Sequence, residues 1–443
     1  MQKNIRAAFL TLGCKVNQYE TDAMQEILES DGYRIVDFKE EADVYIINTC
    51  SVTNMADRKS RQMIHRARKK NPEAIVAAVG CYVQAAEEEL KKGKIADVLI
   101  GNNKKKEIAS ILNAYFIDRE KIAEVEDISE VREYEDLRIH KTAEHTRAYI
   151  KIQDGCNQFC SYCIIPYTRG RIRSKNPDEV VREIQALAKE GFKEVVLTGI
   201  HLSSYGKDLS DGRVGLADII KRIQEVEGIE RIRLGSLEPR IVTEEFVASI
   251  RQCDKVCPHF HLSLQSGCDE TLKRMNRSYD TRDYKKALEI LRKYYDHPAL
   301  TTDVIAGFVG ETEEEFEETR KYLEEINLYE MHIFKYSVRK GTRAERMEGH
   351  VPEEWKSRRS AILLDMAKRH KKDYEQRYIG KEQKVLFEEI VDINGEAYLQ
   401  GHTERYVKVA VKLAENSKKI QQNDMVFVKI LGFLDENLLY GKV

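Results

Sequence analysis

The chain contains the stretch AYIKIQ at Ala148–Gln153, followed after Asp154-Gly155 by CNQFCSYC at Cys156–Cys163. The apolar alternation of the first part predicts a buried strand, and the three cysteines lie just past its carboxyl end. Three thiolates can hold three irons of a [4Fe–4S] cluster and leave the fourth iron open to a small molecule. A structural zinc ion takes four protein ligands, and no nearby histidine or cysteine provides the fourth. The stretch therefore predicts an open iron–sulfur site next to a strand end.

Strand and helix patterns alternate from this stretch towards the C-terminus. Helix starts are well marked, since Asn176 precedes a proline at the first helical position and Thr312 begins a capping box. Further strands are predicted at Glu194–Thr198, Arg231–Leu234, His259–Leu264, Leu300–Ile305 and Met331–Tyr336. Six strand–helix units fit a partial (βα)6 barrel, because parallel strands need a crossover on the outer face. In such barrels, ligands bind at the carboxyl ends of the strands.

Residues 1–115 show the same alternation and predict a doubly wound parallel-sheet domain. Helices are predicted at Tyr19–Ser30 and Met55–Lys70. The strands are predicted at Ile5–Leu12, Asp43–Asn48, Ala74–Val79 and Asp97–Ile100.

Three cysteines of this domain share one structural position. Cys14, Cys50 and Cys81 each fall just past the carboxyl end of a predicted strand, and in a parallel sheet those ends lie on one edge. A single buried cysteine often serves only as a small apolar side chain. Three at equivalent positions favour ligation, so we expect a second iron–sulfur cluster here.

The composition of the remaining segments divides the chain into a connector and two further domains. Residues 116–145 are rich in charge and poor in apolar periodicity, which predicts a connector with some local structure. The strand–helix series gives a domain over residues 146–375, whose last helix, at 353–378, is rich in lysine and arginine. Residues 376–443 carry short alternating strands separated by glycines and predict a small all-β barrel. The fold class is therefore α/β with an added β barrel.

Overall composition is that of an ordinary globular protein. The 443 residues are 42% hydrophobic and 33% charged, with a formal net charge of -2. Apolar runs are too short to cross a bilayer and no signal-peptide pattern is present, so we expect a cytoplasmic location and no membrane partner. Nine cysteines in such a chain indicate metal ligands rather than disulfides. Only local basic segments, at 58–70, 169–175 and 353–378, favour nucleic-acid binding.

With these motifs, the chain resembles the methylthiotransferase family of radical S-adenosylmethionine (SAM) enzymes over nearly its whole length. Val309 and Val338 replace prolines that are usual in the family, which affects only the stiffness of two turns. GHTERY at 401–406 is similar to the TRAM domain, a small RNA-binding β barrel. The other matching motifs are LGCKVNQYE at 12–20, NTCSVT at 48–53, VGC at 79–81, GC at 155–156 through CIIP at 163–166, TRGR at 168–171, LQSG at 264–267, DVIAGF at 303–308 and YSVRKGT at 336–342.

The resemblance implies two [4Fe–4S] clusters, one on each cysteine triad, and SAM as both methyl donor and radical source. One SAM methylates sulfur bound at the N-terminal cluster, and a second is cleaved at the barrel cluster to a radical that takes hydrogen from C2 of an adenine. The implied cluster ligands are Cys14, Cys50 and Cys81, and Cys156, Cys160 and Cys163. The implied SAM-binding residues are Thr198, Gly199, Glu238, Gln265 and Asp303.

The implied partners are the anticodon stem-loop of tRNA, an electron donor such as flavodoxin or ferredoxin, and a sulfur source. Three substrates are usual in the family: isopentenyladenosine in tRNA, threonylcarbamoyladenosine in tRNA, and an aspartate of a ribosomal protein. Cys14–Thr21 together with Lys59–Gln62 looks most like the branch acting on threonylcarbamoyladenosine at tRNA position 37.

Outside the family, the alternative is a non-catalytic iron–sulfur electron carrier or RNA-binding protein. An open-coordinate cluster disfavours it, because electron carriers fill all four ligand positions. Of the remaining cysteines, we expect Cys253 and Cys257 to be buried without metal. Cys268 follows a strand end, where it could be exposed to the site.

Overall fold

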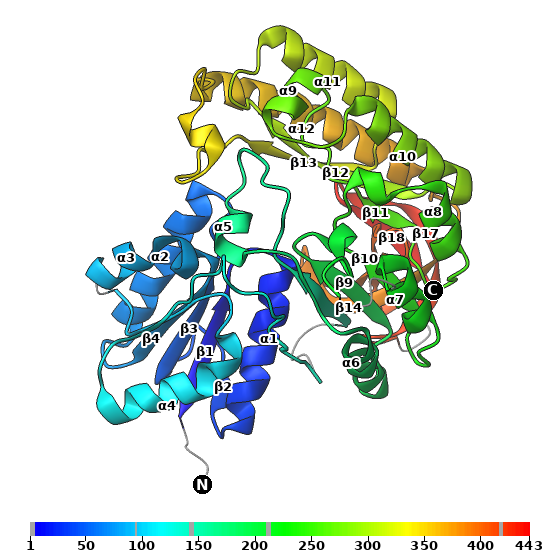
Figure 1. Cartoon of the computed structure of the whole chain (residues 1–443). Coiled ribbons are helices and arrows are strands. Elements are labelled where there is room, and N and C mark those ends of the chain that lie inside the picture. Colours follow the sequence, from blue (N-terminus) through cyan, green and yellow to red (C-terminus); the bar gives the residue numbers. More distant parts are fainter. Residues whose placement is uncertain (1–4, 94, 141–145, 210–213, 416–419) are drawn as a thin grey trace.

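The computed structural model describes residues 5–93, 95–140, 146–209, 214–415 and 420–443. The first domain is a parallel sheet with strand order β2-β1-β3-β4-β5-β6. Apolar residues on both faces of the sheet are buried, one set under each layer of helices, which confirms the predicted doubly wound fold (Figure 1). The elements are β1 (Arg6–Thr11), α1 (Lys15–Ser30), β2 (Arg34–Val36), β3 (Val44–Thr49), α2 (Asn54–Lys70), β4 (Ile75–Gly80), α3 (Cys81–Gly93), β5 (Val98–Ile100), a 3-10 turn (Lys105–Glu107), α4 (Ile108–Asp118) and β6 (Ile122–Glu124).

The sheet continues beyond residue 115. Strand β6 pairs with β5 and lies in the stretch 116–145 that the sequence predicts as a connector. Part of that stretch therefore completes the first domain, while residues 141–145 lie outside the described residues.

The central domain is the predicted partial barrel. Strands β7, β9, β10, β11, β12 and β13 run parallel, with β10 and β11 joined through single bridges such as Leu237 to Leu262. The strands are β7 (Arg147–Asp154), β8 (Arg173–Ser174), β9 (Glu194–Gly199), β10 (Arg231–Leu234), β11 (His259–His261), β12 (Ala299–Ala306) and β13 (Glu330–Lys335). The helices are α5 (Ile165–Arg169), α6 (Pro177–Lys189), α7 (Leu216–Gln224), α8 (Glu244–Arg251), α9 (Asp269–Arg274), α10 (Thr281–Tyr294), α11 (Glu313–Ile326) and α12 (Glu353–Gln376).

Local signals explain where these helices begin. The Asn176 side chain accepts a hydrogen bond from the backbone of Asp178 at 2.9 Å and caps α6. Thr312 and Glu315 form the predicted capping box at the start of α11. Along each barrel strand, one set of alternate residues packs against the helices in a single large core. The other set faces the barrel interior, because successive side chains of a strand point to opposite faces.

The C-terminal domain is a closed β barrel with order β14-β15-β16-β18-β17, as predicted. It packs at the amino ends of the central strands, where Arg231 donates to the carbonyl oxygen of His402 at 3.0 Å and Arg233 to that of Glu404 at 2.9 Å. The opposite end, at the strands' carboxyl ends, faces the first domain (Figure 1). The strands of the C-terminal barrel are β14 (Glu382–Ile393), β15 (Glu396–Thr403), β16 (Lys408–Lys412), β17 (Met425–Asp435) and β18 (Leu438–Lys442).

None of the helices in the described residues combines the length and the apolar character that a membrane span requires.

Candidate functional site

The first cysteine triad lies in the loop after β7. Cys156 is buried, and Cys160 and Cys163 are half-buried. The loop is fixed to the segment after α9, since the backbone N–H of Ser161 donates to the carbonyl oxygen of Met275 at 3.0 Å. From the same segment, Arg277 donates to the Cys160 thiol at 3.1 Å. The structure thus anchors the loop that carries the three thiols and places a cation against one of them.

The second triad forms at the carboxyl edge of the first sheet, where β1, β3 and β4 end. Pairing of Thr49 with Gly80 sets the following residues, Cys50 and Cys81, side by side. Gly13 has a φ of 101°, and a Cβ on it would lie 2.9 Å from the Cys50 sulfur. This close approach requires glycine and brings Cys14 next to Cys50.

Helix N-termini add to this arrangement. Cys14 is the N-cap residue of α1 and Cys81 is the first residue of α3. A helix N-terminus favours negative charge and so favours a thiolate. Of the three, Cys14 is exposed, whereas Cys50 and Cys81 are buried.

Arg169, the last residue of α5, joins the two domains at this point. Its side chain is fully buried and donates to the Cys81 sulfur at 3.3 Å and to Asn17 at 2.7 Å. The Asn17 oxygen in turn lies 3.9 Å from the Cys14 sulfur. Arg169 follows Cys163 by six positions, a rise of roughly 9 Å at helical spacing. The two triads therefore lie on the same interface, with α5 between the first domain and the barrel (Figure 1).

Buried acids compensate the charge of Arg169. It pairs with Glu20 at 2.8 Å and with Asp154 at 3.2 Å, and Lys151 pairs with the same two carboxylates at 2.8 Å. Burial disfavours ionisation of Glu20, but Arg169, Lys105 and Lys151 hold its pKa well below its usual range. Glu20 of the first domain is paired with Lys151 and Arg169 of the barrel, so the network ties the two domains together.

We expect Arg169→Met to loosen this interface. Removing one partner of a buried ion pair costs about 3–5 kcal/mol, because the remaining charge stays buried. Urea unfolding and the iron content per chain after anaerobic reconstitution would measure the effect. Arg182→Met, at a side chain that is 63% exposed, is the matched control. Equal stability and iron content in the two variants would contradict this role for Arg169.

Thiol spacing discriminates between a single ion and a cluster. Among the described residues, no three cysteines have sulfur atoms that all lie within 4.8 Å of one another. Thiolates around one zinc ion stand roughly 4 Å apart, so neither triad has the sulfur spacing of a single tetrahedral ion. Burial raises the pKa of Cys50 and Cys156 to about 11 and that of Cys163 to about 12. Metal binding would therefore displace protons from these thiols.

The residues expected to bind SAM lie at or near the same end of the barrel. Thr198 and Gly199 end β9, and Glu238 follows β10. Gln265 has a φ of 75° and bridges to Val304 of β12. Asp303 differs, since it lies inside β12 and its carboxylate turns towards His261, 3.3 Å away.

The three remaining cysteines are buried. Cys253 belongs to the barrel core, as expected. Cys257 lies beside Arg233, and burial raises its pKa to about 11. Cys268 is also buried and lies near Glu318 of α11, so it faces a helix rather than the thiol loop.

The basic segments differ in their exposure and in their ion pairs. Arg169, Arg173 and Lys175 are at most 1% exposed, so the expectation that 169–175 contacts RNA is wrong for these three side chains. The sequence shows that these side chains are charged, but it does not show the acidic residues with which they pair in the interior. Basic residues of α2 are mostly exposed. In α12, arginines pair with acidic residues of the stretch 311–325. These pairs are Arg358 with Glu313, Arg359 with Glu311 and Arg369 with Glu324.

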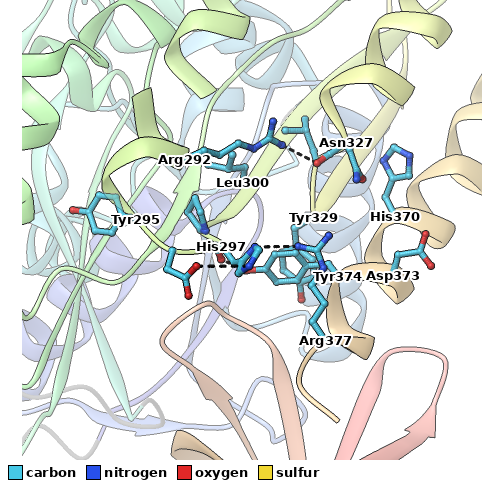
Figure 2. A pocket seen from close by; sticks show the side chains of 13 residues that line it. Arg292, Tyr295, His297, Leu300, Asn327, Tyr329, His370, Asp373, Tyr374 and Arg377 are labelled. Atoms are coloured by element: carbon cyan, nitrogen blue, oxygen red, sulfur yellow. Dashed lines mark hydrogen bonds and ion pairs between the residues drawn. The ribbon is translucent and has the colours of Figure 1, made fainter. Parts of the chain in front are cut away.

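A pocket of about 390 Å³ lies between α10, α12 and the loops before β12 and β13 (Figure 2). Tyr374 donates to the carbonyl oxygen of His297 at 2.8 Å, and Arg292 donates to that of Ile326 at 2.6 Å. These loops stand at the amino ends of the strands. The pocket is therefore at the opposite end of the barrel from the cysteine loop.

Comparison with known proteins identifies the family. Residues 6–101 match the model of Uncharacterized protein family UPF0004, and residues 150–323 match that of the Radical SAM superfamily. Threonylcarbamoyladenosine tRNA methylthiotransferase MtaB of Bacillus subtilis (strain 168) is 40% identical over 411 residues, which cover 92% of this chain and 91% of that protein. The chain belongs to the methylthiotransferase family of radical SAM enzymes.

A second relative supports this assignment, and a solved structure has a similar fold. The tRNA-2-methylthio-N(6)-dimethylallyladenosine synthase of Clostridium tetani is 36% identical and covers 87% of this chain and 86% of its own length. A solved structure of the radical SAM methyltransferase TsrM from Kitasatospora setae superposes with a TM-score of 0.57 at 13% identity and covers 75% of each chain, which shows a shared fold. Membership of the methylthiotransferase family makes this protein an enzyme that uses a [4Fe–4S] cluster and SAM.

Proposed function

We propose that this methylthiotransferase adds a methylthio group to C2 of N6-threonylcarbamoyladenosine at position 37 of tRNA. The observation that carries the proposal is the 40% identity to the B. subtilis MtaB protein over 92% of the chain. The two matching family models, over residues 6–101 and 150–323, span both cysteine triads. The C. tetani relative, named for dimethylallyladenosine, is less similar at 36%.

Two [4Fe–4S] clusters are part of the proposal. Cluster and SAM together supply radical chemistry, which suits an aromatic C–H that no general base can deprotonate. The protein's own task is to hold the clusters close together, through Arg277 at the barrel triad and Arg169 at the other. The proposed ligands are Cys156, Cys160 and Cys163 for one cluster and Cys14, Cys50 and Cys81 for the other.

SAM is proposed to bind at the carboxyl ends of the barrel strands, where Thr198, Gly199, Glu238 and Gln265 lie. The tRNA is proposed to contact the exposed basic residues of α2 and the C-terminal β barrel. Both proposals follow from position: α2 begins four residues after Cys50, and phosphates pair with exposed rather than buried cations. A flavodoxin or ferredoxin would supply electrons, and a separate sulfur source would supply the inserted atom.

The substrate can be tested with the reconstituted enzyme. Supplied with SAM, reductant, a sulfur source and two tRNAs, one carrying threonylcarbamoyladenosine and one isopentenyladenosine, it should methylthiolate only the first. Mass spectrometry of the nucleosides after digestion measures both products. Cys160→Ala enzyme is the control for background. A product on isopentenyladenosine alone, or on a ribosomal-protein aspartate, would overturn the assignment.

A further inference from the structure

Three potential metal ligands meet inside the barrel, in a group that contains no cysteine. His261, Asp303 and His332 offer one ligand atom each, and these atoms all lie within 4.8 Å of one another. They come from three adjacent strands, β11, β12 and β13. Asp303 and His332 are direct partners in the β12–β13 register, and the rings of His261 and His332 stack with centroids 5.8 Å apart.

Strand alternation explains why all three point inwards. Their strand neighbours Phe260, Val304 and Met331 are buried in the core against the helices. His261, Asp303 and His332 occupy the alternate positions and so face the barrel interior. The side chain of Asp303 is 30% exposed and His332 is exposed, so the cluster is accessible from the interior. Among the described residues, this is the one group of three histidine, cysteine or acidic side chains with such close ligand atoms.

The orientation of His261 fits a metal ligand. Its Nδ1 lies 3.0 Å from the Thr301 hydroxyl, while its buried Nε2 has no hydrogen-bond partner and lies 3.3 Å from the Asp303 carboxylate. Metal-binding histidines are held in this way, with one ring nitrogen hydrogen-bonded to a neighbour and the other directed at the ion. When the His261 Nδ1–H donates its hydrogen bond to the Thr301 hydroxyl, Nε2 carries the lone pair, which points at the centre of the cluster.

We propose that His261, Asp303 and His332 form a binding site for one divalent transition-metal ion, separate from the six proposed cluster ligands. Two imidazoles and one carboxylate on one side of an ion leave its other positions open, as in non-heme iron and catalytic zinc sites. Ligand atoms around such an ion stand roughly 3–4 Å apart, which the exposed His332 ring reaches by a small rotation. The proposal gives Asp303 a role different from the SAM contact that the family resemblance implies.

The alternative is a plain hydrogen bond in which His261 Nε2 donates to Asp303. That arrangement gives His332 no role and binds no ion. The two interpretations therefore differ in what removal of the His332 imidazole does to metal binding, a readout that depends neither on tRNA nor on methylthio transfer.

Zinc titration of the tag-free enzyme with reconstituted clusters tests the proposal. After equilibrium dialysis against buffered Zn²⁺, elemental analysis measures zinc and iron per chain separately, so zinc replacing cluster iron would be seen. We expect one zinc per chain in the parent. His332→Ala and Asp303→Asn should lose it, and Thr301→Val should bind roughly 10- to 100-fold more weakly. His65→Ala, at an exposed histidine of α2, should bind like the parent.

Iron content at the parent level would show that each variant is folded. Equal zinc in the parent, His332→Ala and Asp303→Asn would overturn the proposal, as would a parent that binds no zinc. Because the readout is bound zinc, a failed metal site and a wrong tRNA substrate give different results.

Discussion

Replacing Cys160 with alanine should abolish the reductive cleavage of SAM. Cys160 is one of three thiols in the loop after β7, and Arg277 donates to its sulfur at 3.1 Å. With two thiols left, the loop cannot hold a cluster with one open iron. We expect the cleavage rate to fall roughly 10³-fold or more, a loss of about 4 kcal/mol of transition-state stabilisation. Methylthio transfer should stop with it.

Formation of 5′-deoxyadenosine under anaerobic, reducing conditions measures this loss. Cys268→Ala is the matched control, because Cys268 is also buried near a barrel strand end but lies near Glu318 of α11. It should retain cleavage close to the parent rate. Parent-level cleavage by the Cys160 variant would remove this residue from the cluster ligands.

Much of the site geometry could be predicted because it depends on strand ends. The sequence predicts a strand at Ala74–Val79, and the structure has β4 at Ile75–Gly80; a shift of one residue leaves Cys81 past the strand end. The carboxyl ends of parallel strands lie on one edge of the sheet. The sequence alone therefore predicts that three cysteines far apart in the chain lie near one another. Strand β2 could not be predicted, because its three residues are partly exposed and show no alternation of apolar and polar residues.

Contacts between distant segments could not be predicted in this way. Arg169 looks like part of a basic surface run, and its partner Glu20 is 149 residues away. Burial of such an arginine follows from the docking of two domains, which no local pattern encodes. The His261, Asp303 and His332 cluster is similar, since the pairing of Asp303 with His332 depends on the register of two strands. Sequence periodicity indicates which face a residue occupies but not which residue stands opposite it.

The converse variant, Cys14→Ala, should retain SAM cleavage and lose methylthio transfer. Cys14 lies on the first domain at the N-cap of α1, outside the loop that carries Cys156–Cys163. Cys14 is an exposed residue, and the hydrogen-bond contact of its thiol is a long one, 3.9 Å to Asn17. Substitution of an exposed side chain changes stability by about 0.5 kcal/mol or less, so the fold should be preserved. What is removed is one of the three thiols proposed to hold the second cluster.

Three measurements on this variant separate the two triads. Iron per chain should fall by about half, and methylthiolated nucleoside should fall to background. The 5′-deoxyadenosine rate should stay within about twofold of the parent, because the barrel triad and Arg277 are intact. Persistent methylthio transfer would show that Cys14 is not needed for sulfur insertion. Loss of both activities, with unchanged urea unfolding, would mean that the two triads depend on each other through Arg169 rather than acting as separate centres.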